Sequence, residues 1–432
     1  MTKTIKLALV AAMALGTTSA FATNGSALIG TGAKARGMAG VGIGMAHGAE
    51  SALVNPALIS SVDGTEVQFG GTIFMPKVKN ENSLNMDFSQ GGTLPYPNLG
   101  DESSSATSKA DLSVIPAVSL ATKVNDNFYW GVGMWGTAGM GVDYRDAENT
   151  GQLNMVTNLQ LMQFGVPLVY ANSGFSVGIT PVLQYGALDI NYNMSSALQD
   201  AMAMAAGGAP SGPDAKTIGA GVGQDLKFGV NLGLAYEIAG ITMGASYKSK
   251  IDMEYDGVLS TAAGAMTNGA YTNDKLSTPA EIGVGVSYAF SGNTIALDYK
   301  QIKWSDAKGY KDFAWDDQNV ISIGYEYAAD VWAVRVGYNH ASSPISEQTN
   351  ATPDANGLTG GAINTFNLLG FPATVESHVA IGGTYAFSKQ TSVDLALALA
   401  PEVSDTYKNF MGQDITTKHS QSSVSVGLNY NF

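Results

Sequence analysis

Cysteine is missing from the 432-residue chain, and charged residues make up only 13% of it. The lack of cysteine excludes a disulfide framework and metal sites built from thiolates. Positive charge is also scarce, because 22 Lys and Arg stand against 36 Asp and Glu, for a formal net charge of −14. This charge argues against a nucleic-acid partner, since nucleic acid selects basic surfaces.

Histidine is rare as well, with four residues in the chain. None of the four (His47, His340, His378 and His419) lies beside a nucleophile motif. Nucleophilic catalysis needs a base within hydrogen-bond reach of the attacking group. We therefore expect no enzymatic activity, no metal and no cofactor.

No stretch after the first 22 residues reaches about 18 uninterrupted apolar residues, the length that a membrane-spanning helix requires. Residues 1–22 themselves have the pattern of a secretory signal. Lys3 and Lys6 precede an apolar stretch from Leu7 to Gly16, and Ala20-Phe21-Ala22 is a small-residue cleavage site. This signal predicts export, which would suit a secreted soluble protein equally well.

The last ten residues alternate without a break between apolar and small or polar side chains. Alternation with a period of two places the two sets on opposite faces of a strand. The apolar set is Val424, Val426, Leu428, Tyr430 and Phe432. A half-buried strand of a soluble sandwich would look similar. An apolar strand that ends the chain on an aromatic residue also resembles the signal by which the barrel-assembly machinery inserts bacterial outer-membrane proteins.

The same alternation recurs along most of the chain and predicts fourteen strands. We expect them at residues 65–78, 111–123, 128–139, 154–171, 175–192, 224–238, 241–259, 278–290, 294–305, 319–329, 331–343, 377–388, 391–405 and 417–432. Short turns rich in Asn, Asp, Ser and Gly alternate with longer loops near 80–110, 140–153, 193–223, 260–277, 306–318, 344–376 and 406–416. Short turns at one end and long loops at the other indicate an all-β, 14-stranded antiparallel transmembrane barrel over residues 63–432.

Residues 23–62 do not fit the strand pattern. They are rich in Gly and Ala, lack sustained alternation and contain Asn55-Pro56-Ala57. Proline is a poor candidate for a central strand. Because this segment precedes the first strand, we expect it to fold back into the barrel as an N-terminal hatch. A flexible periplasmic tail is the alternative, although such a tail would carry more charge.

At this point the chain resembles the FadL/TodX family of outer-membrane transporters (OmpP1/FadL/TodX). The matching stretches are Asn24-Gly25, Gly32, Arg36-Gly37-Met38-Ala39-Gly40, Ser51 to Ala57, Arg335-Val336-Gly337-Tyr338 with Ser343-Pro344-Ile345, and Gly383 to Phe387 with Ser392-Val393-Asp394. The resemblance implies a hatch that plugs the barrel, with the Asn-Pro-Ala motif inside it. It also implies capture of a hydrophobic ligand by the outer loops, movement of the hatch and lateral release into the membrane at a kinked third strand.

Under this resemblance the expected ligand is a long-chain fatty acid, with aromatic or aliphatic hydrocarbons as the alternative. A general porin is disfavoured, because a hatch would block the pore, and a surface adhesin would rest on the long loops alone. The other partners that we expect are outer-membrane lipid and lipopolysaccharide, and we expect the barrel to be a monomer.

Two apolar stretches in long loops are candidates for the ligand groove. Methionine is flexible and suits chains of varied shape. The candidates are Met194, Leu198 and Met202 in one loop and Phe366, Leu368, Leu369 and Phe371 in another. A helix that caps the barrel mouth is the alternative for the first, and packing against neighbouring loops is the alternative for the second.

Two further sets of residues are candidates for ligand passage. A carboxylate ligand would need a cation in the lumen, and alternation places Lys248, Lys250, Lys300 and Arg335 on the inner face. Salt bridges among barrel wall and hatch are the alternative for each. Gly136, Gly139 and Gly141 lie in the third strand, where glycine often marks a bend, and are the candidate lateral exit. Close packing of these glycines against the hatch is the alternative.

Overall fold

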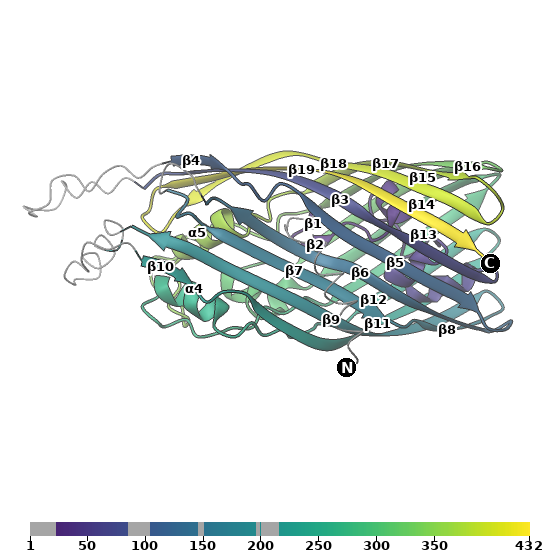
Figure 1. Cartoon of the computed structure of the whole chain (residues 1–432), viewed down its shortest axis with the longest axis horizontal. Coiled ribbons are helices and arrows are strands. Elements are labelled where there is room, and N and C mark those ends of the chain that lie inside the picture. Colours follow the sequence, from purple (N-terminus) through teal and green to yellow (C-terminus); the bar gives the residue numbers. More distant parts are fainter. Residues whose placement is uncertain (1–22, 85–103, 146–150, 196–198, 200–215) are drawn as a thin grey trace, which may run out of the picture.

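The wall of the molecule consists of fourteen antiparallel strands that close on themselves, because the last strand pairs with the first wall strand over most of its length. The computed structural model describes residues 23–84, 104–145, 151–195, 199 and 216–432. In Figure 1 the strands run obliquely to the long axis, as closure of a barrel requires. Closure pairs the first and last wall strands, so neither presents a free edge to lipid.

The strand boundaries follow the predicted ones within a few residues in most cases. The wall strands are β3 (Thr65–Asn82), β5 (Ser113–Lys123), β6 (Phe128–Asp143), β7 (Val156–Gly165) continued by β8 (Leu168–Asn172), β9 (Phe175–Met194), β11 (Gly223–Ile238), β12 (Ile241–Lys248), β13 (Glu281–Phe290), β14 (Asn293–Ile302), β15 (Gln318–Ala328), β16 (Trp332–Ala341), β17 (Ser377–Ala386), β18 (Thr391–Lys408) and β19 (Asp414–Asn431). Two short strands, β4 (Ser104–Thr107) and β10 (Lys216–Gly219), extend the outer ends of the wall beside β3 and β9.

Two predicted boundaries are wrong. The strand expected over 241–259 ends at Lys248, and helix α4 (Val258–Met266) follows it. Gly257 has a left-handed φ of 78° at the start of this helix, whose Ala-rich sequence favours helix. The loop expected over 406–416 is shorter than predicted, since β18 and β19 stay paired as far as Lys408 and Asp414.

Tight turns join the strands at one end of the barrel, as predicted. Three of them have two residues, both with positive φ: Ser173-Gly174, Ala239-Gly240 and Ser291-Gly292. Turns of this kind match the twist of the paired strands. We call this the short-turn end. The long connections lie at the opposite end, as expected for an outer-membrane barrel with its short side in the periplasm.

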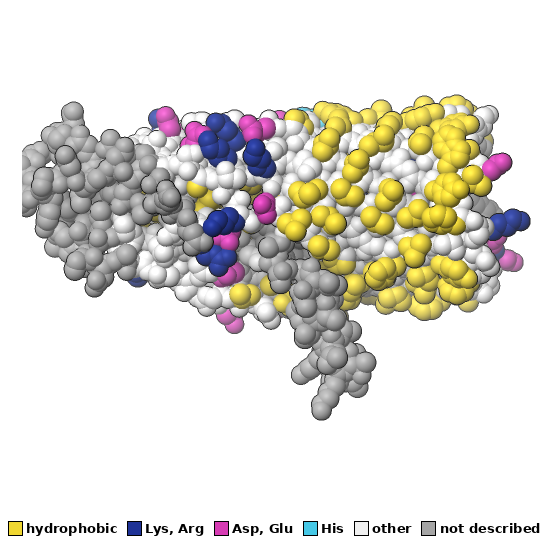
Figure 2. Space-filling model, turned by 45° about the horizontal axis from the view of Figure 1, so that its top comes forward, with side chains coloured by type: hydrophobic (Ala, Val, Ile, Leu, Met, Phe, Trp, Pro, Cys, Tyr) yellow, Lys and Arg dark blue, Asp and Glu magenta, His cyan; other side chains and the backbone are white. Residues whose placement is uncertain are grey.

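The outer surface of the short-turn half is apolar. Figure 2 shows hydrophobic side chains covering this half, with Lys, Arg, Asp and Glu gathered beyond the band. Six aromatic residues are exposed close to the short turns: Tyr236, Tyr288, Phe290, Phe387, Tyr430 and Phe432. Such a band with aromatic girdles is what a lipid-facing barrel presents. No helix among the described residues is long and apolar enough to cross a membrane.

The interior is filled from both ends. Residues 23–62 are almost entirely buried and comprise strands β1 (Thr23–Asn24) and β2 (Ala27–Leu28), helix α2 (Ala33–Gly37) and the 3-10 helices η1 (Glu50–Leu53) and η2 (Pro56–Ser61). The opposite half is filled by α4, the 3-10 helices η3 (Trp304–Asp306) and η4 (Tyr310–Phe313), helix α5 (Gly360–Thr365) and the π-helix η5 (Phe366–Gly370). Any ligand site between residues 23–62 and these loop helices is therefore enclosed by the barrel wall.

Candidate functional site

Residues 23–62 are attached to the inner wall by hydrogen bonds. In the first set, a wall carboxylate accepts the N–H groups of consecutive residues. Asp298 of β14 accepts the N–H groups of Gly42 and Ile43, at 2.7 Å each, and that of Gly44 at 3.2 Å. Ser287 of β13 donates to the carbonyl of Gly44 at 2.7 Å. A carboxylate that accepts several amides makes strong, charge-assisted bonds. The loop over 42–44 is thus fixed to two adjacent strands.

The Asn-Pro-Ala motif serves as a second point of attachment. The side-chain oxygen of Asn55 caps η2 by accepting the N–H of Ala57 at 3.1 Å, and Pro56 occupies the first position of that helix. The side-chain nitrogen of Asn55 donates to the carbonyls of Ile43 at 2.8 Å and Leu234 of β11 at 3.2 Å. One side chain therefore joins η2, the 42–44 loop and the wall, which requires an amide because it must both donate and accept.

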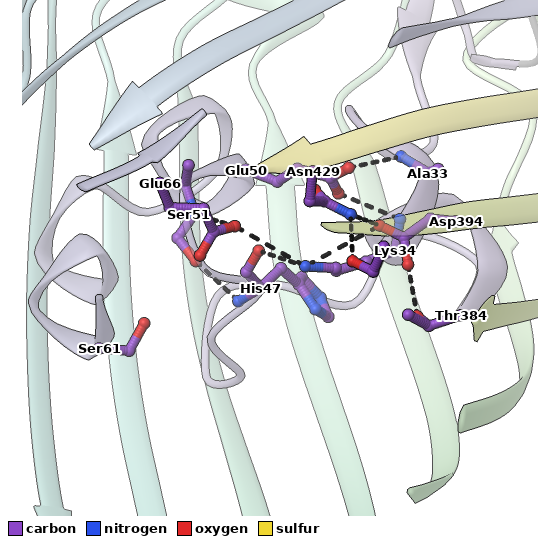
Figure 3. A network of polar contacts seen from close by, with 12 residues as sticks. Ala33, Lys34, His47, Glu50, Ser51, Ser61, Glu66, Thr384, Asp394 and Asn429 are labelled. Carbon is purple, nitrogen blue, oxygen red and sulfur yellow. Dashed lines mark hydrogen bonds and ion pairs between the residues drawn. The ribbon is translucent and has the colours of Figure 1, made fainter. Parts of the chain in front are cut away.

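A network of charged groups links α2 to the wall near the short-turn end (Figure 3). Glu50 accepts the N–H groups of Ala33 and Lys34 at 3.1 and 3.0 Å. The ammonium of Lys34 lies 3.9 Å from both Glu66 of β3 and Asp394 of β18. Burial raises the pKa of Glu50 to about 7, against the opposing effect of Lys34. This attachment consequently contains a carboxyl group that titrates near neutral pH.

The four candidate luminal cations all have acidic partners. Arg335 contacts Glu326 at 2.6 Å and lies 3.7 Å from Asp394. The side-chain amide of Asn429 donates a hydrogen bond to the same Asp394 carboxylate. Lys248 and Lys300 lie 3.5 and 3.2 Å from Glu281, and Lys250 lies 3.7 Å from Asp252. The structure thus brings these cations into ion pairs, and a role in binding a ligand stays a prediction.

The third wall strand, β6, departs from regular pairing at the candidate exit glycines. Its pairing with β5 ends at Trp135, and its register with β7 shifts between Gly136 and Ala138. Beyond this point β6 pairs with the N-terminal segment instead, since Ala138 is registered with Ala27 and Gly139 donates to the carbonyl of Ser26 at 3.1 Å.

The interruption between β5 and β6 ends toward the long connections, where the segment before β5 again bonds to β6. There the N–H of Lys109 donates to the carbonyl of Asp143 at 2.8 Å, and the N–H of Asp143 donates to Ser108 at 2.9 Å. Within the interruption, Ala138 and Gly139 of β6 meet the β1–β2 hairpin where a wall partner would be expected. A gap of this kind is tolerable in a membrane only where other backbone satisfies the freed groups. The hairpin supplies that backbone.

The apolar candidates in the loop over 342–376 lie within the barrel mouth. Phe366, Leu368, Leu369 and Phe371 are all buried, and Phe366 stacks on Phe313 of η4 with ring centroids 4.1 Å apart. In the other loop Met194 is buried at the end of β9. Leu198 and Met202 lie outside the described residues.

Buried apolar contacts extend from this loop cluster to the interruption in the wall. The same connected cluster contains Phe366 and Leu369 of the loop, Ala138 and Met140 of β6, and Ala27 of the hairpin. The sequence analysis did not single out Ser26, Ala27 or Asp298 as functional residues. The partner of Ala27, Ala138, lies 111 residues away in the chain, and the partner of Asp298, Gly42, lies 256 residues away, so no local pattern reveals these contacts.

Comparison with known proteins agrees with this architecture. The sequence model of a family described as "Outer membrane protein transport protein (OMPP1/FadL/TodX)" matches residues 8–356. The chain belongs to this family. It is accordingly an outer-membrane protein, and the family consists of transport proteins.

Individual relatives of this OMPP1/FadL/TodX chain are distant. The "Long-chain fatty acid transport protein" of Escherichia coli K12 is 23% identical over 411 residues, covering 83% of this chain and 84% of the relative. The "47 kDa outer membrane protein" of Pasteurella multocida is 24% identical over 440 residues, covering 90% and 92%.

Solved structures show the same fold. A Pseudomonas aeruginosa FadL homologue superposes with a TM-score of 0.69 at 18% identity, covering 94% of this chain and 100% of that one. The Pseudomonas putida toluene transporter TodX gives a TM-score of 0.64 at 19% identity, covering 95% and 100%. At this identity the likeness establishes the fold and leaves the ligand to other arguments.

Proposed function

We propose that the protein is a channel for passive uptake of hydrophobic molecules, with long-chain fatty acids as the first choice of ligand. Residues 23–62 act as its hatch. The outer loops capture the ligand, the hatch moves, and the ligand leaves sideways through the wall. Relatives named as long-chain fatty acid transport proteins support this choice. Uptake of aromatic or aliphatic hydrocarbons by the same route is the second candidate, supported by the likeness to a toluene transporter.

The observation that carries the proposal is the replacement of β5 by the β1–β2 hairpin along β6. The hairpin meets β6 at Ala138 and Gly139, within the interruption between Trp135 and Asp143, and the Ser26–Gly139 hydrogen bond holds it there. If the hairpin withdraws, the wall opens directly toward lipid at this position. The hatch therefore serves as plug and as gate.

A lateral route also follows from the physical chemistry of the ligand. Burial of each methylene group is worth about 0.8 kcal/mol. A chain of sixteen carbons would forfeit on the order of 10 kcal/mol if it had to cross a water-filled pore. The connected apolar cluster from Phe366 to Met140 and the interruption in the wall provide a path that avoids water.

A reversible disulfide across the hairpin and β6 tests the proposal, since the chain has no cysteine of its own. Ala27 and Ala138 are registered partners, and registered antiparallel residues have Cβ atoms about 4.5–5.5 Å apart. In the variant Ala27→Cys/Ala138→Cys, oxidation should abolish uptake of radiolabelled palmitate by cells, and reduction should restore it.

The matched control is Val118→Cys/Met134→Cys, which joins β5 to β6 where they are already paired. Oxidation of this control should leave uptake unchanged. Equal uptake by the oxidised and reduced hairpin variant would show that the ligand leaves elsewhere. Parallel uptake assays with hexadecane and toluene decide between fatty acids and hydrocarbons.

The outer surface of the barrel carries a group of lysines that indicates a further partner besides the ligand. Lys79 and Lys418 are registered neighbours on β3 and β19, both in contact with Glu81 at 2.8 and 3.2 Å, and Lys77 is exposed beside them. They lie just beyond the exposed apolar residue Ile73. We propose that these lysines bind phosphate groups of lipopolysaccharide around a monomeric barrel. The variant Lys77→Ser/Lys79→Ser should co-purify with less lipopolysaccharide by mass spectrometry.

The apolar alternation of β19 supports insertion by the barrel-assembly machinery.

A further inference from the structure

A groove crosses the outer surface of the wall from β6 to β13. Its volume is about 1060 Å³, comparable to the roughly 300–1,000 Å³ of ligand pockets in proteins. None of the described residues that line it carries a charge. An apolar lining is expected of any lipid-facing wall, but a hollow is not, because the wall of a barrel curves outward. The groove is therefore a candidate binding site on the membrane side of the protein.

The lining side chains form two parallel rows of registered neighbours on the outer face. Registered residues of adjacent antiparallel strands have Cβ atoms about 4.5–5.5 Å apart, so each row is a continuous strip across the strands. The second row, from Trp130 to Ile282, lies two residues further from the short turns along each strand. The first row consists of Phe128, Tyr170, Val177, Leu234, Ala245 and Val284.

Ala245 of β12 forms the floor of the groove. Its half-buried side chain ends at Cβ, whereas its registered neighbours Leu234 and Val284 are 47% and 54% exposed. The wall is also irregular beside the groove, between β7 and β8, where Pro167 lacks the N–H that a regular ladder needs. A short side chain and an interrupted strand together leave room for a long, apolar ligand.

The groove runs obliquely to the membrane. Phe128 is the first residue of β6 and directly follows a short turn, whereas Val284 lies well before Phe290, the last residue of β13. One end of the groove is therefore at the membrane surface on the short-turn side, and the other end is within the apolar band. A lipid of the periplasmic leaflet lies in this direction, with its head group at the short turns and its acyl chains toward the middle of the membrane.

Charged side chains stand at the surface end of the groove. Val124 lines the groove there, and Lys123 directly precedes it. The ammonium of Lys123 lies 4.0 Å from Asp63 and 3.7 Å from Asp126, and both carboxylates are 99% exposed. Two exposed carboxylates beside one lysine leave an excess of negative charge, which attracts an ammonium group. The lysine is in turn a suitable contact for a phosphate.

We propose that this groove binds a phospholipid of the periplasmic leaflet, with its acyl chains on Ala245 and an ammonium-bearing head group at Asp63 and Asp126. The two carboxylates favour phosphatidylethanolamine over phosphatidylglycerol, because the head group of the latter carries no cation. The site lies on the outside of the wall, and the interruption of β6 at Ala138 and Gly139 is not part of its lining. It is consequently independent of the proposed transport function.

Native mass spectrometry of protein released from nanodiscs that contain equal amounts of phosphatidylethanolamine and phosphatidylglycerol tests the site. The wild-type protein should retain phosphatidylethanolamine in preference. Ala245→Trp fills the floor of the groove and should abolish this retention. Val336→Trp is the matched control, because Val336 is an apolar residue of β16 that is 48% exposed and lies outside the groove, and it should retain lipid as the wild type does. Heat-modifiable migration of each variant on gels confirms that the barrel has folded.

A second comparison tests the head group. Asp63→Asn/Asp126→Asn should lower the preference for phosphatidylethanolamine several-fold without reducing the total phospholipid retained, since single charges act measurably on lipid head groups at a membrane surface. Asp330→Asn changes an exposed carboxylate of the turn between β15 and β16 and should leave the preference unchanged.

Two results would overturn the proposal directly. Equal retention by Ala245→Trp and Val336→Trp would show that the groove holds no lipid of its own, and equal retention of both phospholipids by the wild type would refute the head-group assignment. If protein extracted from outer membranes lost bound lipid A, or a second copy of the chain, through Ala245→Trp, the groove would have a different occupant and the proposal would be wrong.

Discussion

The carboxylate of Asp298 accepts the backbone N–H of Ile43 at 2.7 Å, so a wall strand holds residues 23–62, the proposed hatch, by their main chain. The same carboxylate accepts the N–H groups of Gly42 and Gly44. A hydrogen bond to a charged group contributes about 1.5–3 kcal/mol. Removing this acceptor would leave three buried donors without a partner.

Asp298→Ala should therefore loosen the hatch by about 3 kcal/mol or more. Trypsin should then cleave after Lys34 and Arg36, which are half-buried and buried in the wild-type protein. Glu281→Gln is the control, because Glu281 pairs with Lys248 and Lys300 of the wall and should leave the hatch resistant. Equal cleavage rates for both variants would show that Asp298 does not hold the hatch.

Asn55 permits a test of which of its hydrogen bonds matters. Asn55→Asp keeps the oxygen that caps η2 but cannot donate to the carbonyls of Ile43 and Leu234, and it places a carboxylate against them. We expect this variant to be cleaved by trypsin at least as fast as Asn55→Ala. If capping alone were important, Asn55→Asp would behave as the wild type does, and resistance to trypsin would reveal it.

Deletion of residues 23–62 should leave a folded barrel that conducts small polar solutes. The wall closes through the pairing of β3 with β19, which involves no residue of the hatch. Single-channel conductance in planar bilayers should rise well above that of the intact protein. A conductance equal to that of the wild type would mean that the outer loops close the pore by themselves.

The attachment of the hatch should weaken as pH rises, because of Glu50. Its pKa in the folded protein is raised by burial from 4.5 to about 7. A raised pKa means that the attached hatch holds the proton more tightly than the released one, so the stabilisation is complete below pH 4.5 and is lost as pH rises through 7. The change amounts to at most about 3 kcal/mol.

Leak conductance of the wild-type protein should accordingly increase between pH 5 and pH 8. Glu50→Ala removes the titrating group, so its conductance should not change with pH, whereas the protein without residues 23–62 should leak at both pH values. A wild-type conductance that does not change with pH, or that falls, would contradict the assignment to Glu50.

Much of the wall could be predicted from the sequence, because one-residue alternation and turn chemistry are local signals. The Ser173-Gly174, Ala239-Gly240 and Ser291-Gly292 turns were identifiable from residue type alone. The helix after Gly257 was not, since a short apolar run such as Val258-Leu259 fits a strand as well as a helix.

The site was harder to predict, because its contacts join distant parts of the chain. Alternation placed Lys248 and Arg335 correctly on the inner face, but only the folded barrel reveals Glu281 and Glu326 as their partners. Arg36 was visible as part of a family motif, whereas its burial beside Ser423 depends on the strand at the other end of the chain. Local sequence therefore specifies faces, and closure of the barrel specifies neighbours.

The glycines of β6 give the most direct test of the lateral exit. A Cβ atom at Gly136 would lie 2.6 Å from Cγ2 of the buried Ile115, closer than real contacts allow. Valine favours regular strand at Gly136 and Gly139, and at Gly136 it also crowds Ile115 of β5. Overpacking of this kind costs about 1–3 kcal/mol, which a barrel of this size should survive.

We therefore expect Gly136→Val/Gly139→Val to reduce cellular uptake of radiolabelled palmitate while binding to the purified protein stays near the wild-type level. Met134→Val lies on the same strand where pairing with β5 is regular, and it should change neither quantity. A joint loss of binding and uptake would place these glycines in the ligand pocket. If uptake were unaffected, the ligand would have to cross the wall at another strand, since the interruption beside Gly136 would then be sealed without consequence.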